Sequence, residues 1–143
     1  MPEPVDREGL PADLQTRHDQ ATLDTALARI GAVVAALDTS DSLAGIDPQD
    51  GLTLRVLKVG EEFGETAQAL IGAVGQNPRK GVTHTYADVR AELYDVALTA
   101  LVAAASLSDG WAGEFGEHVY AKTSRVVEAV GRGPTDDDER KAR

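Results

Sequence analysis

Residues 85–107 are the segment that most limits how this chain can fold. The segment opens with a helix-capping pair, Thr85 followed three residues later by Asp88. Beyond Asp95 it is apolar nearly all round, which is typical of a helix buried on most sides. The same helix carries a narrow polar strip at spacings of four, three and four: Asp88, Glu92, Asp95 and Thr99. Because ionised carboxylates inside a helical core are costly unless paired, this fold must bring a positive charge to the strip.

A second group of carboxylates lies on the preceding helical segment. It consists of Glu61, Glu62 and Glu65, and Lys58 is the only base within about a turn of them. A link of about ten residues separates this segment from residues 85–107, and helices joined in this way pack as antiparallel neighbours. Oxygen-only ligands favour a hard cation, so the sequence predicts Mg²⁺, with Mn²⁺ as the substitute. The competing interpretation is that both acidic groups simply cover a solvated face.

The segments before residue 75 are also predicted to be mainly helical. Apolar residues at helical spacing predict a first helix over about 19–37, with a start nearer Asp13 as the alternative. Residues 38–46, rich in Asp, Ser and Thr, are expected to form a loop. Asp47 as the cap and Pro48 at the first helical position predict the start of the second helix. Gly75 is expected to end it.

The predicted fold class is all-α, with a four-helix bundle-like arrangement. A fourth helix is expected over about 111–130. The predicted organisation is a disordered leader over 1–12, one helical domain over 13–131 and a disordered charged tail over 132–143.

Composition limits the classes of partner. A formal net charge of -10 argues against binding nucleic acid or an anionic membrane, both of which need clustered basic residues. The absence of cysteine excludes disulfides and thiolate metal sites. The longest apolar run, 96–107, is too short to span a bilayer, and residues 1–9 have no signal-peptide pattern. A cytoplasmic location is therefore expected.

The acidic groups resemble the EExxE…ExxD signature of the MazG-like all-α nucleoside triphosphate pyrophosphohydrolases. Glu61, Glu62 and Glu65 match its first half, and Glu92 and Asp95 match its second half. The resemblance implies hydrolysis of a nucleoside or deoxynucleoside triphosphate to the monophosphate and pyrophosphate. It also implies a homodimer or homotetramer, in which helices of two protomers complete the bundle.

The resemblance further implies roles for individual residues. The expected metal ligands are four acidic residues: Glu62, Glu65, Glu92 and Asp95. The expected catalytic residues are Glu61 and Glu62, with Glu61 supporting a second metal ion or acting as general base on the attacking water. The expected contacts to the substrate phosphates come from three basic residues: Lys58, Lys122 and Arg125.

Other functions compatible with the sequence are kept as alternatives. The first is a catalytically silent helical dimer that binds a nucleotide or a metal and serves a partner protein, which the small number of basic residues would suit. The second is a phosphoribosyl-ATP pyrophosphohydrolase, which the longer N-terminal helix and tail make less suitable. The link residues Arg79 and Lys80 either contact phosphate or serve only as a soluble connection. No Glu-x-x-His motif is present, which argues against a di-iron bundle.

Overall fold

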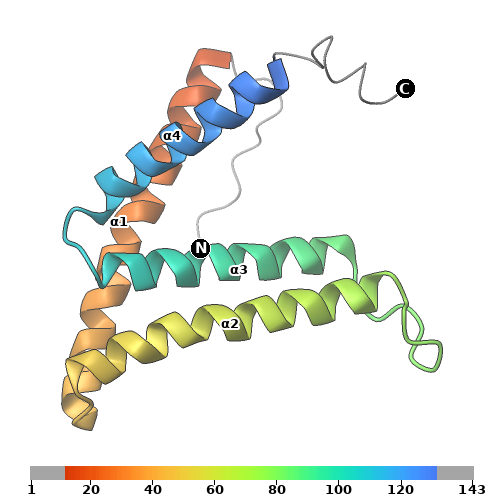
Figure 1. The fold of residues 1–143 in the computed structure, drawn as a ribbon, viewed down its shortest axis with the longest axis horizontal. Coiled ribbons are helices and arrows are strands. Elements are labelled where there is room, and N and C mark those ends of the chain that lie inside the picture. The colour runs from red at the N-terminus through yellow and green to blue at the C-terminus, as the bar shows by residue number, and fades with distance from the viewer. Residues whose placement is uncertain (1–11, 132–143) are drawn as a thin grey trace, which may run out of the picture. The chain divides into compact units, whose positions relative to one another are not determined.

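The computed structural model describes residues 12–131 of the 143-residue chain. Within those residues it contains helices and no strand, which confirms the predicted all-α class (Figure 1). The expected leader, apart from Ala12, and the expected charged tail lie outside the described residues. The helices are α1 (Ala12–Ala44), α2 (Pro48–Ala73), α3 (Tyr86–Ala105) and α4 (Trp111–Gly131).

The chain divides into two compact units. The first runs through Ser108 and contains α1, α2 and α3, and the second begins at Asp109 and contains α4. The bounds of α4 agree with the helix expected over 111–130. A single domain over 13–131 and a complete four-helix bundle stay predictions.

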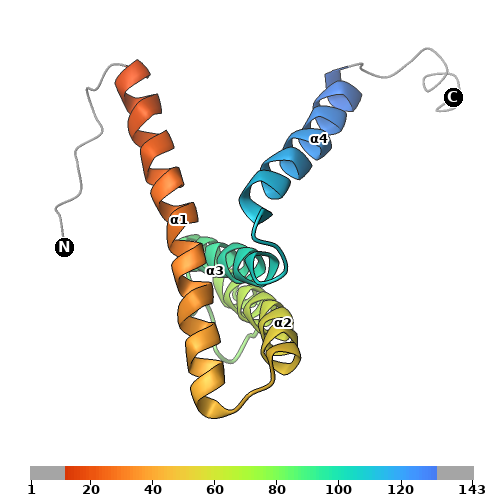
Figure 2. The same ribbon diagram turned by 90° about the vertical axis from the view of Figure 1, so that its left-hand side faces the viewer.

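Helices α2 and α3 form an antiparallel pair within the first unit (Figures 1 and 2). The carboxylate of Asp47 caps α2 by accepting a hydrogen bond from the Gln49 amide at 2.9 Å, and Pro48 occupies the first turn. At the start of α3 the Thr85 hydroxyl accepts from the Asp88 amide at 3.2 Å, and the Asp88 carboxylate accepts from the Thr85 amide at 2.7 Å. Both predicted helix starts are confirmed.

Two glycines shape the link between α2 and α3. Gly75 has a φ of +63°, a left-handed conformation that favours glycine, and it follows the end of α2 as predicted. A Cβ on Gly72 would collide with the His84 ring and would lie 2.6 Å from Thr83 Oγ1. The missing side chain lets the link fold back onto α2, where the Thr83 amide donates to the Gly72 carbonyl at 3.0 Å. This return sets the start of α3 beside the end of α2.

The segment expected to be a loop, 38–46, is mostly helical, so that prediction is wrong. The physical reason is Arg55 of α2, whose Nη2 lies 2.8 Å from Asp38 Oδ1 and 2.7 Å from Asp41 Oδ2. Its Nη1 donates to Ser106 Oγ, just after α3, at 2.9 Å. Asp and Ser favour loops when their side chains bond nearby backbone groups. Here both aspartates pair with another helix instead, so the last turns of α1 remain helical.

The α2 helix packs against α3 through its small and acidic face. Thr66 and Ala69 on this face are buried, with 8% and 2% of their surface exposed. Apolar residues at helical spacing form a stripe along α2 that faces away from the rest of the first unit, and Phe63 in this stripe is 65% exposed. The other exposed members of the stripe are Val56, Leu70 and Val74.

The expectation that α3 is buried on most sides is wrong for the single chain. Leu93 and Leu98 are 51% and 47% exposed, whereas Val102 and Ala103 near the end of the helix are buried. The reason is that, among the described residues of the first unit, α3 has only α2 and part of α1 beside it (Figure 2). The pair of α2 and α3 therefore presents a large uncovered apolar surface.

One part of α1, Gln20–Ala44, is long and apolar enough to cross a membrane by length and composition. It differs from 96–107, the run singled out from the sequence. A single helix of this kind is weak evidence of a membrane span, because a core helix of a soluble protein meets the same criteria.

Candidate metal centre

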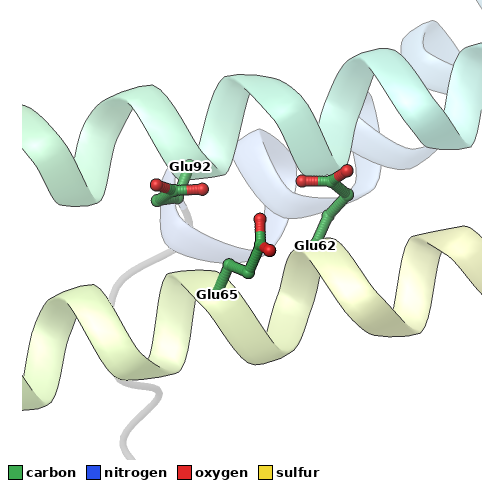
Figure 3. A group of neighbouring side chains, drawn as sticks. All are labelled: Glu62, Glu65 and Glu92. Atoms are coloured by element: carbon green, nitrogen blue, oxygen red, sulfur yellow. The ribbon is translucent and has the colours of Figure 1, made fainter.

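Three glutamates converge between α2 and α3 (Figure 3). Glu62, Glu65 and Glu92 each offer one carboxylate oxygen, and these oxygens all lie within 4.8 Å of one another. The Glu62 side chain is 12% exposed, Glu92 is half-buried and Glu65 is exposed. This glutamate trio contains three of the four predicted metal ligands, drawn from both acidic groups of the sequence.

Helix geometry and small neighbouring residues bring the trio together. Glu62 and Glu65 are three residues apart and therefore lie on one face of α2. The buried small residues Thr66 and Ala69 continue this face and allow α2 to approach α3 closely. Glu92 extends toward the same space from α3 (Figure 3). The cluster thus depends on the antiparallel pairing of two helices.

The charges of the trio repel one another. The pKa of Glu65 is raised above its ordinary value, mainly by the negative charge of Glu62, and also by loss of hydration and by Glu92. A divalent cation shared by the three carboxylates would remove this repulsion. The electrostatics of the trio therefore favour cation binding.

Lys58 places a positive charge beside one member of the trio. Its Nζ lies 2.9 Å from Glu62 Oε1 and 3.0 Å from Glu61 Oε2. The hydrogen bonds to Glu62 and Glu61 raise the pKa of Lys58, so its side chain is an ammonium. Lys58, which is expected to contact phosphate, is therefore paired with Glu61, which is expected to act as general base.

The remaining predicted site residues are not members of the trio. Asp95 is exposed, lies one turn beyond Glu92 on α3, and its backbone carbonyl accepts a hydrogen bond from Thr99 Oγ1 at 2.7 Å. Lys122 and Arg125 are exposed on α4, in the second unit. The predicted roles of these three residues remain predictions.

The sequence analysis did not predict a cavity in the first unit. A cavity of about 420 Å³ lies among α1, α2 and α3, and its lining includes Arg55 and Lys58 of α2 but no member of the trio. The sequence did contain a signal for the ion pair between Arg55 and the two aspartates beside this cavity. Arg55 falls on the same face of α2 as Lys58 and Glu62, while Asp38 and Asp41 are three residues apart on the preceding segment. A basic residue on an acidic helix face, matched by two nearby aspartates, indicates an ion pair between helices.

Protein-family models, curated proteins and solved structures give no match to this chain. The fold and the trio define a class in physical terms: an all-α protein with a candidate metal centre on an antiparallel helix pair. Carboxylate oxygens are the ligands that Mg²⁺ and Mn²⁺ prefer, and a site with few protein ligands leaves positions for water and phosphate oxygens.

Proposed function

We propose that this protein is a Mg²⁺-dependent nucleoside triphosphate pyrophosphohydrolase that releases a monophosphate and pyrophosphate. The observation that carries the proposal is the meeting of the Glu62, Glu65 and Glu92 carboxylates within 4.8 Å across two helices. These residues also occupy the EExxE…ExxD pattern that the chain shares with MazG-like enzymes. Removal of non-standard or excess nucleotides from the pool is a role suited to such an activity.

The glutamate trio, joined by Asp95, would hold Mg²⁺, with Mn²⁺ as a substitute. The bound ion would supply positive charge to the phosphate oxygens and would activate a water molecule. The trio contributes oxygen ligands only, which suits an ion that is completed by substrate phosphates.

Glu61 and Lys58 are suited to proton transfer and phosphate binding, respectively. The Glu61 carboxylate would accept the proton of the water that attacks the α-phosphorus. The new P–O bond forms as the bond to the bridging oxygen breaks, and pyrophosphate leaves. When a cation neutralises Glu62, the Lys58 ammonium, which lies 2.9 Å from Glu62 Oε1, can turn to a phosphate oxygen. Lys122 and Arg125 would add further positive charge.

We also propose that the protein acts as a homodimer or homotetramer. The supporting observation is the uncovered apolar surface on α2 and α3, where Phe63 is 65% and Leu93 is 51% exposed. A contiguous apolar surface of this kind is typical of a protein–protein interface. A second copy would bury it while leaving the acidic face of α2 against α3.

A cytoplasmic location without membrane insertion fits the charges of α1. Four charged residues interrupt the apolar part of this helix: Asp24, Arg29, Asp38 and Asp41. Charged side chains are costly in the hydrocarbon core of a bilayer. Asp38 and Asp41 also pair with Arg55 of α2, which joins this end of α1 to the helical pair. The net charge of -10 argues against nucleic acid as a partner.

The alternative is a catalytically silent nucleotide- or metal-binding dimer that serves a partner protein. The observation in its favour is the pairing of Lys58 with Glu61 and Glu62, which neutralises part of the acidic group without a metal. Such a protein would gain thermal stability with nucleotide and Mg²⁺ and would release no product.

The test is hydrolysis of a panel of NTPs and dNTPs with Mg²⁺ or Mn²⁺, with added pyrophosphatase and detection of phosphate. We expect turnover by the wild-type chain and a loss of at least about a hundredfold in Glu62→Gln, because a metal ligand is removed. The matched control is Asp24→Asn on α1, which should retain activity. Absence of turnover with every nucleotide and either metal would reject the proposal.

A further inference from the structure

A second cavity of the first unit lies where the link between α2 and α3 folds back onto α2. Its volume is about 300 Å³, at the lower end of the roughly 300–1,000 Å³ range of ligand pockets. This link cavity shares no lining residue with the cavity at Arg55 and Lys58. The polar residues of its wall are Gln68 of α2 and Asn77, Lys80, Thr83 and His84 of the link.

The turn around Asn77 fixes the link through hydrogen bonds of its own. The amides of Lys80 and Gly81 donate to the Asn77 carbonyl at 3.1 and 3.0 Å. The amide of Arg79 donates to the side-chain oxygen of Asn77, Oδ1, at 3.1 Å. An Asn side chain that bonds the backbone two residues on stabilises a turn of this kind. The turn therefore places both Asn77 and Lys80 in the cavity wall.

The side chains in the wall offer mainly hydrogen-bond donors. Because Asn77 Oδ1 already accepts from the Arg79 amide, the Asn77 group left for a ligand is the side-chain amide nitrogen, which is a donor. Lys80 has donors only, and it forms no ion pair with any residue in 12–131. His84 is half-buried, and its Nδ1 lies 3.0 Å from Thr83 Oγ1. A ligand in the link cavity therefore meets an unpaired ammonium and an amide donor.

The link is also a basic segment of an acidic protein. Residues 66–87 contain no Asp or Glu, although the whole chain has 24 such residues and a net charge of -10. The same segment contains Arg79, Lys80 and His84. A concave site with charge of one sign concentrates ions of the opposite sign. The charge of the link therefore favours an anion.

Two carboxylates border this basic segment, and neither lines the cavity. Asp88 accepts hydrogen bonds from the Thr85 amide at 2.7 Å and the Thr85 hydroxyl at 2.9 Å. These bonds lower the pKa of Asp88, with a smaller contribution from His84, so this carboxylate is committed to the helix cap. Glu65 lies one helical turn before Gln68 on α2 and belongs to the trio, where a bound cation would neutralise it.

We infer that the link cavity binds an oxyanion of the phosphate class, such as inorganic phosphate or pyrophosphate, through Lys80 Nζ and Asn77 Nδ2. The inference stands without the proposed function, because it requires neither a metal nor hydrolysis. A lysine ammonium and an amide donor together suit an anion that carries several acceptor oxygens. Two sources supply such an anion. One is the pyrophosphate end of a triphosphate held at the trio, and the other is a free phosphate compound.

Other classes of ligand fit the link cavity less well. A cation would be repelled by Lys80, and none of the three carboxylates of the trio lines this cavity. An apolar molecule would find one large apolar side chain, Ile71, among the described lining residues. A neutral sugar would form similar hydrogen bonds, but its affinity would not depend on the charge of Lys80 or on salt. Salt dependence therefore separates a sugar-type site from an anion site.

Titration of pyrophosphate and of inorganic phosphate into the full chain without metal, followed by calorimetry, tests the inference. We expect pyrophosphate to bind and its affinity to fall several-fold as salt is raised. Lys80→Met should weaken this binding by about tenfold or more, because the ammonium is lost. Arg90→Met, an exposed base on α3, is the matched control and should keep the affinity. No detectable binding of either anion, or equal affinity in Lys80→Met, would overturn the inference.

Two variants of the turn separate the cavity from the general charge of the link. Asn77→Asp keeps an oxygen to accept from the Arg79 amide, so the turn is retained, while a carboxylate replaces the amide donor. It should abolish anion binding with the helical circular dichroism spectrum unchanged. Arg79→Met removes the neighbouring charge, which does not line the cavity, and should weaken binding much less than Lys80→Met does. Equal losses in Arg79→Met and Lys80→Met would assign the binding to the basic segment as a whole and reject the site.

Hydrolysis assays distinguish the two sources of the anion. Without added pyrophosphatase, monophosphate release is followed by chromatography with and without pyrophosphate. If the cavity holds the pyrophosphate end of the substrate, Lys80→Met should raise KM and weaken product inhibition by pyrophosphate. If it holds a free phosphate compound, Lys80→Met should lose metal-free binding and keep KM. Anion binding without any hydrolysis retains the inference and rejects the proposed function, whereas hydrolysis without metal-free anion binding does the reverse.

Discussion

At the scale of single residues, the site is governed by charges that would respond in opposite ways to a metal. Lys58 is held between Glu61 and Glu62, at 3.0 and 2.9 Å, and a divalent cation competes with its ammonium for Glu62. Glu65 is in the reverse situation, because its neighbours Glu62 and Glu92 raise its pKa and a cation would relieve that repulsion. Metal binding should therefore release Lys58 and stabilise ionised Glu65.

Lys58→Met tests the competition at Glu62. Without the ammonium, Mn²⁺ should bind several-fold more tightly, while kcat/KM for a triphosphate should fall by about tenfold or more because a phosphate contact is lost. Mn²⁺ binding is followed by electron paramagnetic resonance and activity by phosphate release. Arg90→Met, an exposed base on α3, is the control. Unchanged metal affinity and unchanged activity would contradict the role given to Lys58.

Glu65→Gln should change stability and metal binding in opposite directions. The raised pKa means that the folded chain binds the Glu65 proton more tightly than the unfolded chain does. Ionisation of Glu65 therefore reduces stability as pH rises from its ordinary pKa through the raised one, and the full penalty remains at neutral pH. The variant should have a higher Tm than wild type without metal at neutral pH, and should lose most of the Mg²⁺-induced rise in Tm.

Thermal unfolding at several pH values measures this effect. The difference in Tm between Glu65→Gln and wild type should shrink as the pH is lowered through the titration of Glu65. Mg²⁺ affinity of the wild type should weaken over the same interval, because the carboxylate must be ionised to bind. A lower Tm for the variant at neutral pH without metal would show that the Glu65 charge is not repelled.

At the scale of helices, the sequence predicted where α2 and α3 begin better than it predicted which faces of the helices pack together. The caps at Asp47 and Thr85 were recognisable because capping depends on neighbouring residues alone. The trio was also predictable, since a helical spacing of three and a short link bring Glu62, Glu65 and Glu92 together. The helical ending of α1 was missed, because the local composition of residues 38–46 favours a loop and the pairing of Asp38 and Asp41 with Arg55 of the next helix outweighs it. The sequence likewise could not show that the apolar stripe of α2 lies on its uncovered face.

Arg55→Met tests the connection between α1 and the helical pair. The guanidinium, with its side chain 10% exposed, pairs with Asp38 and Asp41 and donates to Ser106. Its removal leaves two aspartates without a partner and should lower the free energy of unfolding by about 2 kcal/mol. Urea denaturation measures the change, and Arg29→Met, exposed on α1, is the control. Equal stability of the two variants would show that the ion pair does not hold α1 in place.

At the scale of the whole molecule, the apolar surface that the first unit leaves uncovered on α2 and α3 supports the proposed homodimer or homotetramer. Among the residues the structure describes, the buried apolar side chains are few: Ile30, Ala69, Val102 and Ala103. So small a core provides little hydrophobic stabilisation, whereas the stripe on α2 could supply more if another protomer covered it. Association and stability should therefore be coupled.

Phe63→Glu tests the interface. A charge in the centre of the exposed stripe, where Phe63 is 65% exposed, should convert the dimer or tetramer to a monomer and lower Tm. Analytical ultracentrifugation gives the mass of each species. Leu43→Glu, 86% exposed near the end of α1, should leave the assembly unchanged. A monomeric wild type at micromolar concentration would contradict the proposed dimer.

The most direct test of the proposed metal centre is anomalous X-ray scattering from crystals grown with Mn²⁺. The proposal predicts an anomalous peak between α2 and α3 that is bonded to oxygens of Glu62, Glu65 and Glu92. Crystals of Glu62→Gln grown in the same solution should have a much weaker peak. Well-ordered wild-type crystals with no peak at the trio, and with the three carboxylates each hydrated separately, would contradict the central claim.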